Sequence, residues 1–492
     1  MHEPRNEETR FAFRLRLALL GPVLFGLVLA WRPPGLDPAG GRTLAVAAWM
    51  AAWWLTGAVP LPVTALLPLP LFPWLGVASP AQAAVPYANP VIFLFMGGLF
   101  LAAAIERWGL HRRIALGVLA RTGTSPRRVV AGFMGVTAFL SMWISNTATA
   151  ALAMPIALAV LRLAGERPGQ SAWGAALMLG VAYAASIGGV ATLIGTPPNA
   201  IFAANAQELG GRSVGFAEWF TFAAPVAAVL LAFAWWVLCV ARYRLPRRAP
   251  EELGAALAAA RDRLGPWTPA ERRTALVFAA TALAWLAREP KTIAGWTVPG
   301  LQSLWPRVDD ATIAMAAAAA LFLTPAGRGA RTGNTLLDWE TAQRIPWGVL
   351  LLFGGGLSLA TQFEATGCTT WFAERLGALR GWPAVALTGA VATTFLLVTE
   401  VASNTATAAL AMPVVAALGQ ATGADPLPLM AAVAVASSLA FMLPVGTPPN
   451  AIVYATGYVS ASEMASAGWR LNLASAVGVT LAMHTWFRWV VA

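Results

Sequence analysis

Two identical polar heptapeptides stand in an otherwise apolar sequence. Ser-Asn-Thr-Ala-Thr-Ala-Ala occupies residues 145–151 and recurs at residues 403–409. Its hydroxyls and amide can coordinate a small hard cation through oxygen atoms or hold an anion through N–H donors. Ser, Asn and Thr also cap helix N-termini, which would explain a single copy without any ligand. Because the same stretch occurs twice, we favour a binding role, with which capping can coexist.

Each heptapeptide is followed by a second shared motif, Gly-Thr-Pro-Pro-Asn, at residues 195–199 and 446–450. Its prolines remove two backbone N–H donors and its glycine permits unusual backbone angles, so a helix that contains it must break. In lipid, a broken helix is tolerated only where protein buries it or where it lines a cavity. A simple proline kink is the alternative. We expect the two breaks and the two heptapeptides to form one site.

The composition indicates an integral membrane protein. Of 492 residues, 58% are hydrophobic and only 11% are charged, compared with about 25% charged residues in soluble domains. The length allows roughly ten or more membrane spans of about 20 residues each. The net charge of +11 is typical of cytoplasmic loops that follow the positive-inside rule, and it does not indicate a nucleic-acid partner.

The sequence lacks the usual motifs of enzymes and cofactor-binding proteins. Its two cysteines and three histidines form no metal-binding pattern, and it contains no phosphate-binding loop or dinucleotide fingerprint. An intramembrane enzyme would need a nucleophile with a base, or metal ligands. We therefore expect no enzyme activity and no cofactor.

The apolar segments predict an all-α polytopic membrane protein with about 11 transmembrane helices and two re-entrant helical hairpins. Residues 129–163 and 385–418 are the predicted hairpins, because each arm beside the motif has only about 16 residues, too few for a full span. Residues 173–206 and 426–458 are the predicted broken helices. Arginine-rich segments place the N-terminus in the cytoplasm and the C-terminus outside. Residues 17–31 could imitate a secretory signal, but we favour a retained span.

The motifs belong to an internal repeat. Asn404 follows Asn146 by 258 residues, and the same offset aligns Glu364 with Glu106. The orientation of the spans predicts that the repeats are inverted, as in secondary transporters, whose site lies near the midplane. Duplication retained only for packing would explain matching apolar residues but not buried Asn and Thr. The predicted units are the tail and first span (1–43), the first repeat (44–243), a cytoplasmic linker (244–273) and the second repeat (274–492).

The four motif copies, in this order, resemble those of the divalent anion/sodium symporter family, whose members carry di- and tricarboxylates or sulfate. The resemblance extends from about Leu44 to the end of the chain. It implies a homodimer in which each protomer has a scaffold domain and a transport domain that moves as an elevator. An ion channel would instead need a continuous polar pore, which hairpins on opposite sides do not favour.

The resemblance also implies two sodium sites and an anion site between them. The first sodium site maps onto Ser141, Ser145, Asn146 and Gly195, and the second onto Thr399, Ala402, Asn404 and Gly446. Substrate-binding residues map onto Asn146, Thr147, Thr196, Asn404, Thr405, Thr447 and Pro448. No Lys or Arg lies in these motifs, so bound sodium would help to balance the charge of a dianion.

The expected function is sodium-coupled symport of a C4-dicarboxylate such as succinate, in a bacterial inner membrane. Sulfate or a tricarboxylate is the alternative substrate, and sodium-independent dicarboxylate exchange is the alternative mechanism. Glu400 precedes Asn404 by four residues and has Met142 at the equivalent position of the first repeat. An intramembrane carboxylate is a functional candidate, although a salt bridge or an interfacial position would explain it equally well.

Overall fold

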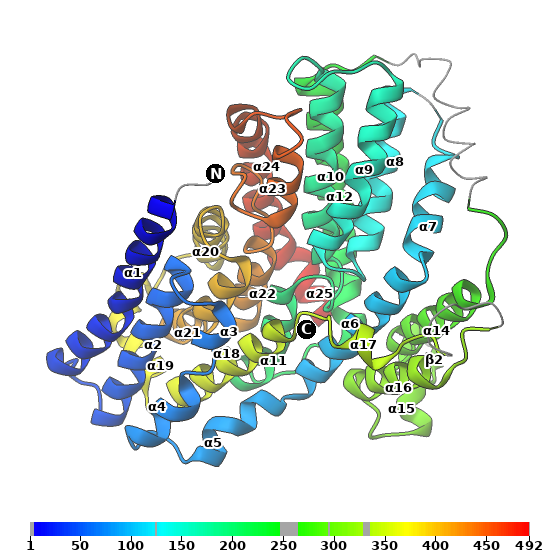
Figure 1. Cartoon of the computed structure of the whole chain (residues 1–492). Helices are drawn as coiled ribbons and strands as arrows, with labels where there is room; N and C mark the ends of the chain where they lie inside the picture. The colour runs from blue at the N-terminus through cyan, green and yellow to red at the C-terminus, as the bar shows by residue number, and fades with distance from the viewer. Residues whose placement is uncertain (1–3, 124, 247–263, 294–295, 328–334, 492) are drawn as a thin grey trace.

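The structure is a computed structural model, and it describes all residues except 1–3, 124, 247–263, 294–295, 328–334 and 492 (Figure 1). Helices make up nearly all of its regular structure. In the part described, one short antiparallel hairpin, β1 (Lys291–Ile293) with β2 (Trp296–Val298), departs from the predicted all-α fold. The helical class is otherwise as the sequence predicts.

The first half of the chain forms helices α1 to α12 and the π-helix η2. They are α1 (Pro4–Trp31), α2 (Pro38–Thr56), α3 (Leu61–Thr64), α4 (Pro68–Trp74), α5 (Pro80–Ala84), η1 (Val85–Ala88), α6 (Pro90–Arg107), α7 (Leu110–Leu119), α8 (Pro126–Ser141), α9 (Asn146–Leu163), α10 (Ala172–Val190), α11 (Pro197–Gly210), α12 (Phe216–Trp236) and η2 (Val237–Arg242).

The second half begins after the linker. It contains α14 (Pro269–Leu286), α15 (Leu301–Leu304), α16 (Asp310–Leu323), α17 (Trp339–Ala342), α18 (Trp347–Ala365), α19 (Cys368–Arg375), η3 (Leu376–Leu379), α20 (Ala384–Thr399), α21 (Asn404–Thr422), α22 (Pro426–Ala436), α23 (Pro448–Tyr454), α24 (Ala461–Ala482), η4 (Met483–Phe487) and α25 (Arg488–Val491).

The polar heptapeptides lie at helix starts. α8 ends at Ser141 and α9 begins at Asn146, and in the same way α20 ends at Thr399 and α21 begins at Asn404. The two helices of each pair pack against each other, as Figure 1 shows for α8 and α9. Each pair therefore has the form of a hairpin with the motif at its tip.

The Gly-Thr-Pro-Pro-Asn segments also restart helices. α11 begins at Pro197 and α23 begins at Pro448, each with proline at the first helical position. Proline suits this position because its missing N–H has no partner there in any helix, and its fixed φ is already helical. The interruption covers residues 191–196 in the first half and the longer stretch 437–447 in the second half.

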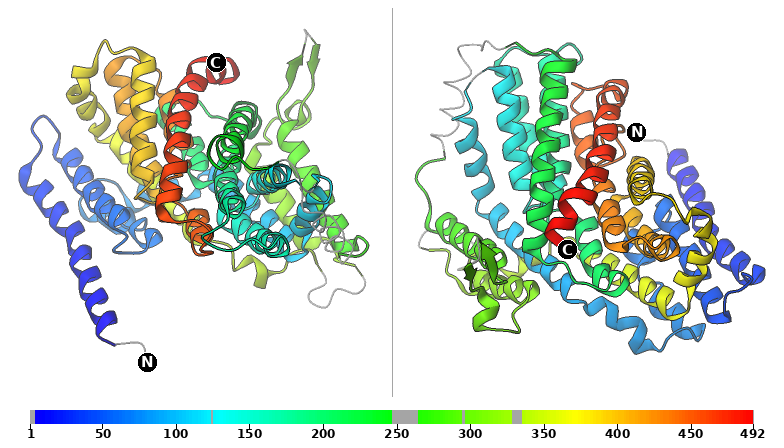
Figure 2. Two further views of the ribbon diagram at one scale, coloured as in Figure 1. Left: turned by 90° about the horizontal axis from the view of Figure 1, so that it is seen from above. Right: turned by 180° about the vertical axis from the view of Figure 1, so that it is seen from behind.

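The two halves of the chain interlock around these interruptions. The first hairpin packs on the second broken helix through α9 and α23, and the second hairpin packs on the first broken helix through α21 and α11. α10 contacts α23, and α11 contacts α22. Figures 1 and 2 show the orange segments of the second half set against the green segments of the first. Every residue of the most apolar stretch of α10 is buried, so this helix lies at the centre of the fold.

Six of the described helices are long and apolar enough to cross a membrane, or seven if the bent pair Cys368–Leu379 and Ala384–Thr399 counts as one span. Four further apolar helices have between 10 and 17 residues, which is short for a full span. The chain is thus a polytopic membrane protein. The predicted number of 11 spans and the orientation of the termini remain predictions.

An ion pair fixes the end of the linker to α7. Residues 247–263 of the predicted linker lie outside the described part, which resumes at residue 264. Arg113 on α7 binds the Glu271 carboxylate, with Nε 2.8 Å from Oε1, and donates to the backbone carbonyls of residues 264–266. Burial alone would raise the pKa of Glu271, but hydrogen bonds from Arg113 and Thr268 outweigh it and lower this pKa.

Candidate functional site

A central cavity of ≈ 750 Å³ lies where the two halves of the chain meet. Residues 145–147 and 195–197 line it from the first half, and residues 403–405 and 446–449 line it from the second half. The structure therefore brings both copies of both motifs to one space. Sequence positions about 250 residues apart become the opposing walls of a single candidate site.

The cavity is neutral but rich in helix N-termini. None of the described residues that line it is Lys, Arg, Asp or Glu. Helices α9, α11 and α21, of 14 to 19 residues, all begin at this cavity. Because the first turn of a helix has unpaired N–H groups and a partial positive charge, such ends stabilise anions. The cavity can therefore hold an anion without a cationic side chain.

Oxygen atoms crowd around the Asn146 amide at the first tip. One end of this amide lies 2.8 Å from Ser141 Oγ, 3.2 Å from the carbonyl oxygen of Ala185 and 3.3 Å from that of Gly195. Ser141 Oγ also donates to the carbonyl oxygen of Ala185, at 2.6 Å. The amide nitrogen can donate to these oxygens. With the amide oxygen turned toward them, the same atoms form an oxygen cage of the kind that binds a hard cation.

The second tip repeats this arrangement. Thr399 Oγ1 lies 2.7 Å from Asn404 Oδ1 and 2.7 Å from the carbonyl oxygen of Ser437. Thr399 is fully buried, as is Ser141 in the first half. A hydroxyl one helical turn before the motif therefore orients the tip Asn in both halves. Ser and Thr can share this role because both carry the hydroxyl that the arrangement needs.

Two glycines allow this close packing at the first tip. A Cβ atom on Gly189 would lie 2.4 Å from Asn146 Oδ1, and one on Gly195 would lie 2.4 Å from the carbonyl oxygen of Gly189. The space at the second tip is less tight, since a Cβ atom on Gly446 would lie 3.0 Å from both Ala440 Cβ and Glu400 Oε2. At the first tip, the glycine of the pentapeptide motif thus brings its own carbonyl oxygen to within 3.3 Å of the Asn146 amide.

The last residue of each pentapeptide holds its helix break in place. Asn199 Nδ2 donates to the carbonyl oxygens of Gly189, Val190 and Thr192 at 3.1, 3.0 and 2.8 Å. Asn450 Nδ2 donates to those of Ala440 and Leu443 at 3.1 and 3.0 Å. Both side chains are fully buried. The sequence analysis did not assign these residues, although a polar residue after two prolines, repeated in both copies, was a usable signal.

Glu400 supports only the second break. Its carboxylate accepts the backbone N–H groups of Phe441, Met442 and Leu443 at 2.8 to 3.0 Å, and the Asn472 side chain donates to it at 2.7 Å. Glu400 is 4% exposed. Among the described residues Glu400 forms no salt bridge, and it is buried, so the structural alternative of a salt bridge or an interfacial position does not describe this environment. The carboxylate instead replaces backbone acceptors that an unbroken helix would supply. A functional role for Glu400 remains a prediction.

Capping explains one tip better than the other. Ser145 Oγ accepts the backbone N–H of Ala148 at 3.2 Å, so Ser145 caps α9. Ser403 occupies the equivalent position before α21 but makes no such hydrogen bond. Helix capping alone therefore does not account for the identical serine in both copies.

The structure brings the predicted site residues together. The predicted substrate-binding residues all line the central cavity: Asn146, Thr147, Thr196, Asn404, Thr405, Thr447 and Pro448. The predicted sodium ligands that also line it are Ser145, Asn146, Gly195, Ala402, Asn404 and Gly446. Ser141 and Thr399 lie behind the tips, where they contact the two Asn side chains. Whether each residue binds sodium or the anion remains a prediction.

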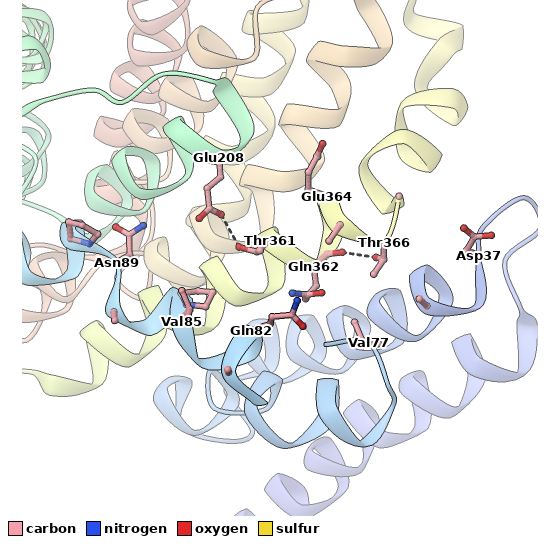
Figure 3. A pocket seen from close by; sticks show the side chains of 17 residues that line it. Asp37, Val77, Gln82, Val85, Asn89, Glu208, Thr361, Gln362, Glu364 and Thr366 are labelled. Carbon is pink, nitrogen blue, oxygen red and sulfur yellow. Dashed lines mark hydrogen bonds between the residues drawn. The ribbon is translucent and has the colours of Figure 1, made fainter. Parts of the chain in front are cut away.

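The larger cavity of ≈ 1030 Å³ is a poorer candidate for an anion site (Figure 3). Asp37, Glu208 and Glu364 line it, and none of its described lining residues is Lys or Arg. Glu208 on α11 accepts a hydrogen bond of 2.8 Å from Thr361 Oγ1 on α18, which Figure 3 shows as a dashed line. Like charges disfavour a dianion here. This cavity shares no lining residue with the central one.

A smaller cavity adjoins the central one. Leu99, Ser145 and Pro346 line both the central cavity and a neighbouring cavity of ≈ 440 Å³. Glu106, Arg107 and Arg344 are the charged residues that line the smaller cavity. The candidate site therefore lies next to a cavity at the end of α6 that carries Arg107, and it shares no lining residue with the acidic cavity.

Comparison with known proteins assigns the family. The family described as "Sodium:sulfate symporter transmembrane region" matches residues 13–492. The chain belongs to this family. The resemblance to divalent anion/sodium symporters that the motifs indicated is therefore confirmed, and so is the prediction that the chain is a transporter and not an enzyme.

Two curated relatives agree with this assignment, and two solved structures share the fold. The sodium-dependent dicarboxylate transporter SdcS of Staphylococcus saprophyticus is 39% identical over 95% of this chain and 90% of the relative. SdcS of Staphylococcus aureus is 38% identical over the same shares. The Alcanivorax borkumensis YdaH transporter has a TM-score of 0.60 at 19% identity, covering 91% of this chain and 98% of that one. Neisseria gonorrhoeae MtrF gives 0.57 at 13%, covering 93% and 96%. At these identities the two structures show a shared fold only.

Proposed function

We propose that this protein is a secondary active transporter that couples the uptake of a C4-dicarboxylate, such as succinate, to sodium. The observation that carries the proposal is the central cavity. None of its described lining residues is charged, and at each of two opposing tips an Asn side chain lies among oxygen atoms. Helix N-termini and N–H groups would bind the two carboxylates. A sodium ion behind each Asn would supply the positive charge that the lining residues lack.

Sodium lowers the cost of placing a dianion in this site. The desolvation of an unpaired charge is expensive in a low-dielectric protein interior. Two cations close to the tips would reduce that cost, so the anion would bind well only after sodium. The names of the SdcS relatives, which describe sodium-dependent dicarboxylate transport, support this choice over sulfate or a tricarboxylate.

The arrangement of the repeats supports an elevator-type transport cycle. We infer that the two hairpins and the broken helices move together against a scaffold, as an elevator, in a homodimer in the bacterial plasma membrane. The cavity that adjoins the candidate site at the Arg107 end of α6 supports an inward-facing state, because arginine-rich segments favour the cytoplasm. This assignment keeps the N-terminus inside and the C-terminus outside.

Uptake of labelled succinate into proteoliposomes tests the proposal. We expect accumulation under an inward sodium gradient and little uptake when potassium replaces sodium. Competition by unlabelled sulfate and citrate ranks the alternative substrates. Succinate uptake driven equally by a counter-gradient of succinate without sodium would identify an exchanger, and no succinate uptake under either condition would contradict the proposal.

A further inference from the structure

Tyr183 joins the first half of the chain to the helix break of the second half. It lies on α10 and is fully buried. Its hydroxyl donates to the backbone carbonyl of Phe441 at 3.0 Å and, at 3.4 Å, to that of Met464 on α24. The rings of Tyr183 and Phe441 also meet edge-on, with centroids 5.0 Å apart. A side chain of the first repeat therefore holds a backbone group inside the interruption of the second repeat.

The equivalent carbonyl of the first break is held from within its own half. Val190 and Phe441 each lie five residues before the glycine of their pentapeptide. The Val190 carbonyl accepts the indole N–H of Trp219, on α12, at 2.9 Å. Counted back from the pentapeptides, the second half has Ala434 at the position of Tyr183, and alanine has no side-chain donor. The aromatic donor that crosses between the halves therefore has no repeat-related copy.

Tyr183 lies on the same turn of α10 as a carbonyl of the proposed first sodium site. Two residues further along, the carbonyl oxygen of Ala185 lies 2.6 Å from Ser141 Oγ and 3.2 Å from one end of the Asn146 amide. A helix is stiff over two residues, because its hydrogen bonds fix the backbone. Any shift of Ala185 that accompanies sodium binding at the first tip therefore also moves the Tyr183 hydroxyl.

The peptide that Tyr183 holds belongs to the segment that carries the proposed second sodium site. The Phe441 N–H donates to Glu400 at 2.8 Å, so hydrogen bonds hold this residue through both its N–H and its carbonyl. Five residues later, Gly446 lies against the same carboxylate, since a Cβ atom on it would be 3.0 Å from Glu400 Oε2. Gly446 is a predicted ligand of the second sodium ion. Holding Phe441 therefore limits the conformations of the segment that presents Gly446.

Building on the proposed function, we propose that Tyr183 is a positioning residue that couples the two sodium sites. Sodium at the first tip fixes this part of α10, and the Tyr183 hydroxyl then holds the second break in its binding conformation. A ligand that meets an already ordered segment loses less conformational freedom, so its affinity rises. Coupling of this kind is reciprocal and commonly changes an affinity by about 5- to 150-fold. The two sodium ions should therefore bind cooperatively.

Equilibrium binding of radioactive sodium to the purified full-length protein tests this coupling. Two coupled sites allow a Hill coefficient that approaches about 2, whereas two independent sites give at most about 1. We expect cooperative binding by wild type. Tyr183→Phe removes only the hydroxyl, so it should lower the Hill coefficient to about 1 and raise the sodium concentration at half-saturation by about 5-fold or more.

Two further variants show whether the hydroxyl acts through the coupling. Trp219→Phe is the matched control, because it removes the equivalent donor at the first break and leaves the link between the halves intact. It should retain cooperative binding. Asn404→Ala removes the amide of the second site, and in that background Tyr183→Phe should no longer change the sodium affinity of the first site. A purely structural role predicts an unchanged Hill coefficient and the same effect in both backgrounds.

The outcomes separate this inference from the proposed function. An unchanged sodium-binding curve in folded Tyr183→Phe overturns the inference, and so does an equal loss of cooperativity in Trp219→Phe. If Tyr183→Phe does not fold, Asn404→Ala alone decides, because coupling requires it to weaken sodium binding at the first site, and an unchanged affinity there overturns the inference. Independent binding of two sodium ions by wild type also overturns it but leaves sodium-coupled transport intact. Absence of sodium binding in wild type contradicts the proposed function itself.

Discussion

In the first half of the chain, α10 continues to Val190, and only residues 191–196 separate it from α11. In the second half, α22 stops at Ala436, and residues 437–447 form a longer non-helical stretch before α23. The N–H groups of residues 441–443 would lack acceptors there, and Glu400 supplies them. At the position of Glu400, the first half has Met142, whose backbone carbonyl accepts the Thr192 hydroxyl.

This comparison separates the parts of the site that the repeat preserves from the parts that it does not. Three features have equivalents in both halves: the tip residues, the hydroxyl that contacts the tip Asn (Ser141 or Thr399), and the last Asn of the pentapeptide. The groups that hold the helix ends differ. Symmetry therefore extends to the atoms that would contact ligands, whereas each half stabilises its break in its own way.

The largest expected effect concerns the two tip amides. Asn146→Ala and Asn404→Ala should each reduce sodium-driven succinate uptake by about 100-fold or more, equivalent to about 3 kcal/mol, because each removes an oxygen ligand and an anion contact together. Uptake in proteoliposomes measures the loss, with equal amounts of folded protein. As matched controls, Ser141→Thr and Thr399→Ser keep the bracing hydroxyl and should retain most of the activity. Normal transport by both alanine variants would exclude a site shared between the halves.

Replacing Glu400 should reduce the stability of the fold much more than replacing Met142. Glu400→Ala leaves several buried N–H groups without an acceptor, at about 1–3 kcal/mol for each group, so we expect a loss of several kcal/mol. Met142→Ala should cost less, about 2 kcal/mol, since its interacting carbonyl belongs to the backbone. Thermal unfolding in detergent compares the two. A smaller loss for Glu400→Ala than for Met142→Ala would refute the role assigned to the carboxylate.

Asn199 and Asn450 should both stabilise their helix breaks, and Asn199 should contribute more. Asn199 donates to three carbonyl oxygens and Asn450 to two. Replacing either by Leu keeps a similar volume but removes the donors, and we expect destabilisation of about 1–3 kcal/mol with Asn199→Leu the larger. Thermal midpoints at matched sodium concentrations provide the measurement. If both variants retain wild-type midpoints, these amides do not support the breaks.

The smallest expected effect lies outside the site, in the ion pair between Arg113 on α7 and Glu271 on α14. Trp371 is equivalent to Arg113, so the repeat provides no second copy of this ion pair. Since the folded pKa of Glu271 is lowered, its contribution is present above the unfolded value of about 4.3 and disappears as pH falls through the folded value. Glu271→Gln should cost about 1 kcal/mol at neutral pH.

A pH series of thermal midpoints tests this last point. The gap between wild type and Glu271→Gln should narrow as pH decreases below about 4.3. A gap that stays constant down to the acid limit would show that the ionised carboxylate contributes nothing. Trp371→Phe in the second half is the control, because it carries no titrating group and should give a pH-independent difference.

The sequence predicted the helical class and the residues that converge on the central cavity, because their signals are local. Polar residues and prolines in apolar segments are visible without any knowledge of the fold, and their recurrence identified a repeat. Asn199 and Asn450 were visible in the same motif but were not recognised as braces, because their partners are backbone carbonyls whose positions depend on the break. The role of Glu400 could not be predicted, since it depends on where α22 ends. The acidic cavity was also missed, because Asp37, Glu208 and Glu364 converge only in the folded chain.

Thermal stabilisation of the purified protein tests the central claim most directly, namely that two sodium ions beside the tip amides prepare the site for a dianion. A ligand that binds only the folded state stabilises it by about 1.4 kcal/mol for each tenfold excess over its dissociation constant. We predict that sodium raises the unfolding temperature, that potassium does not, and that succinate adds further stabilisation only with sodium. Equal stabilisation by succinate in sodium and in potassium would contradict the account.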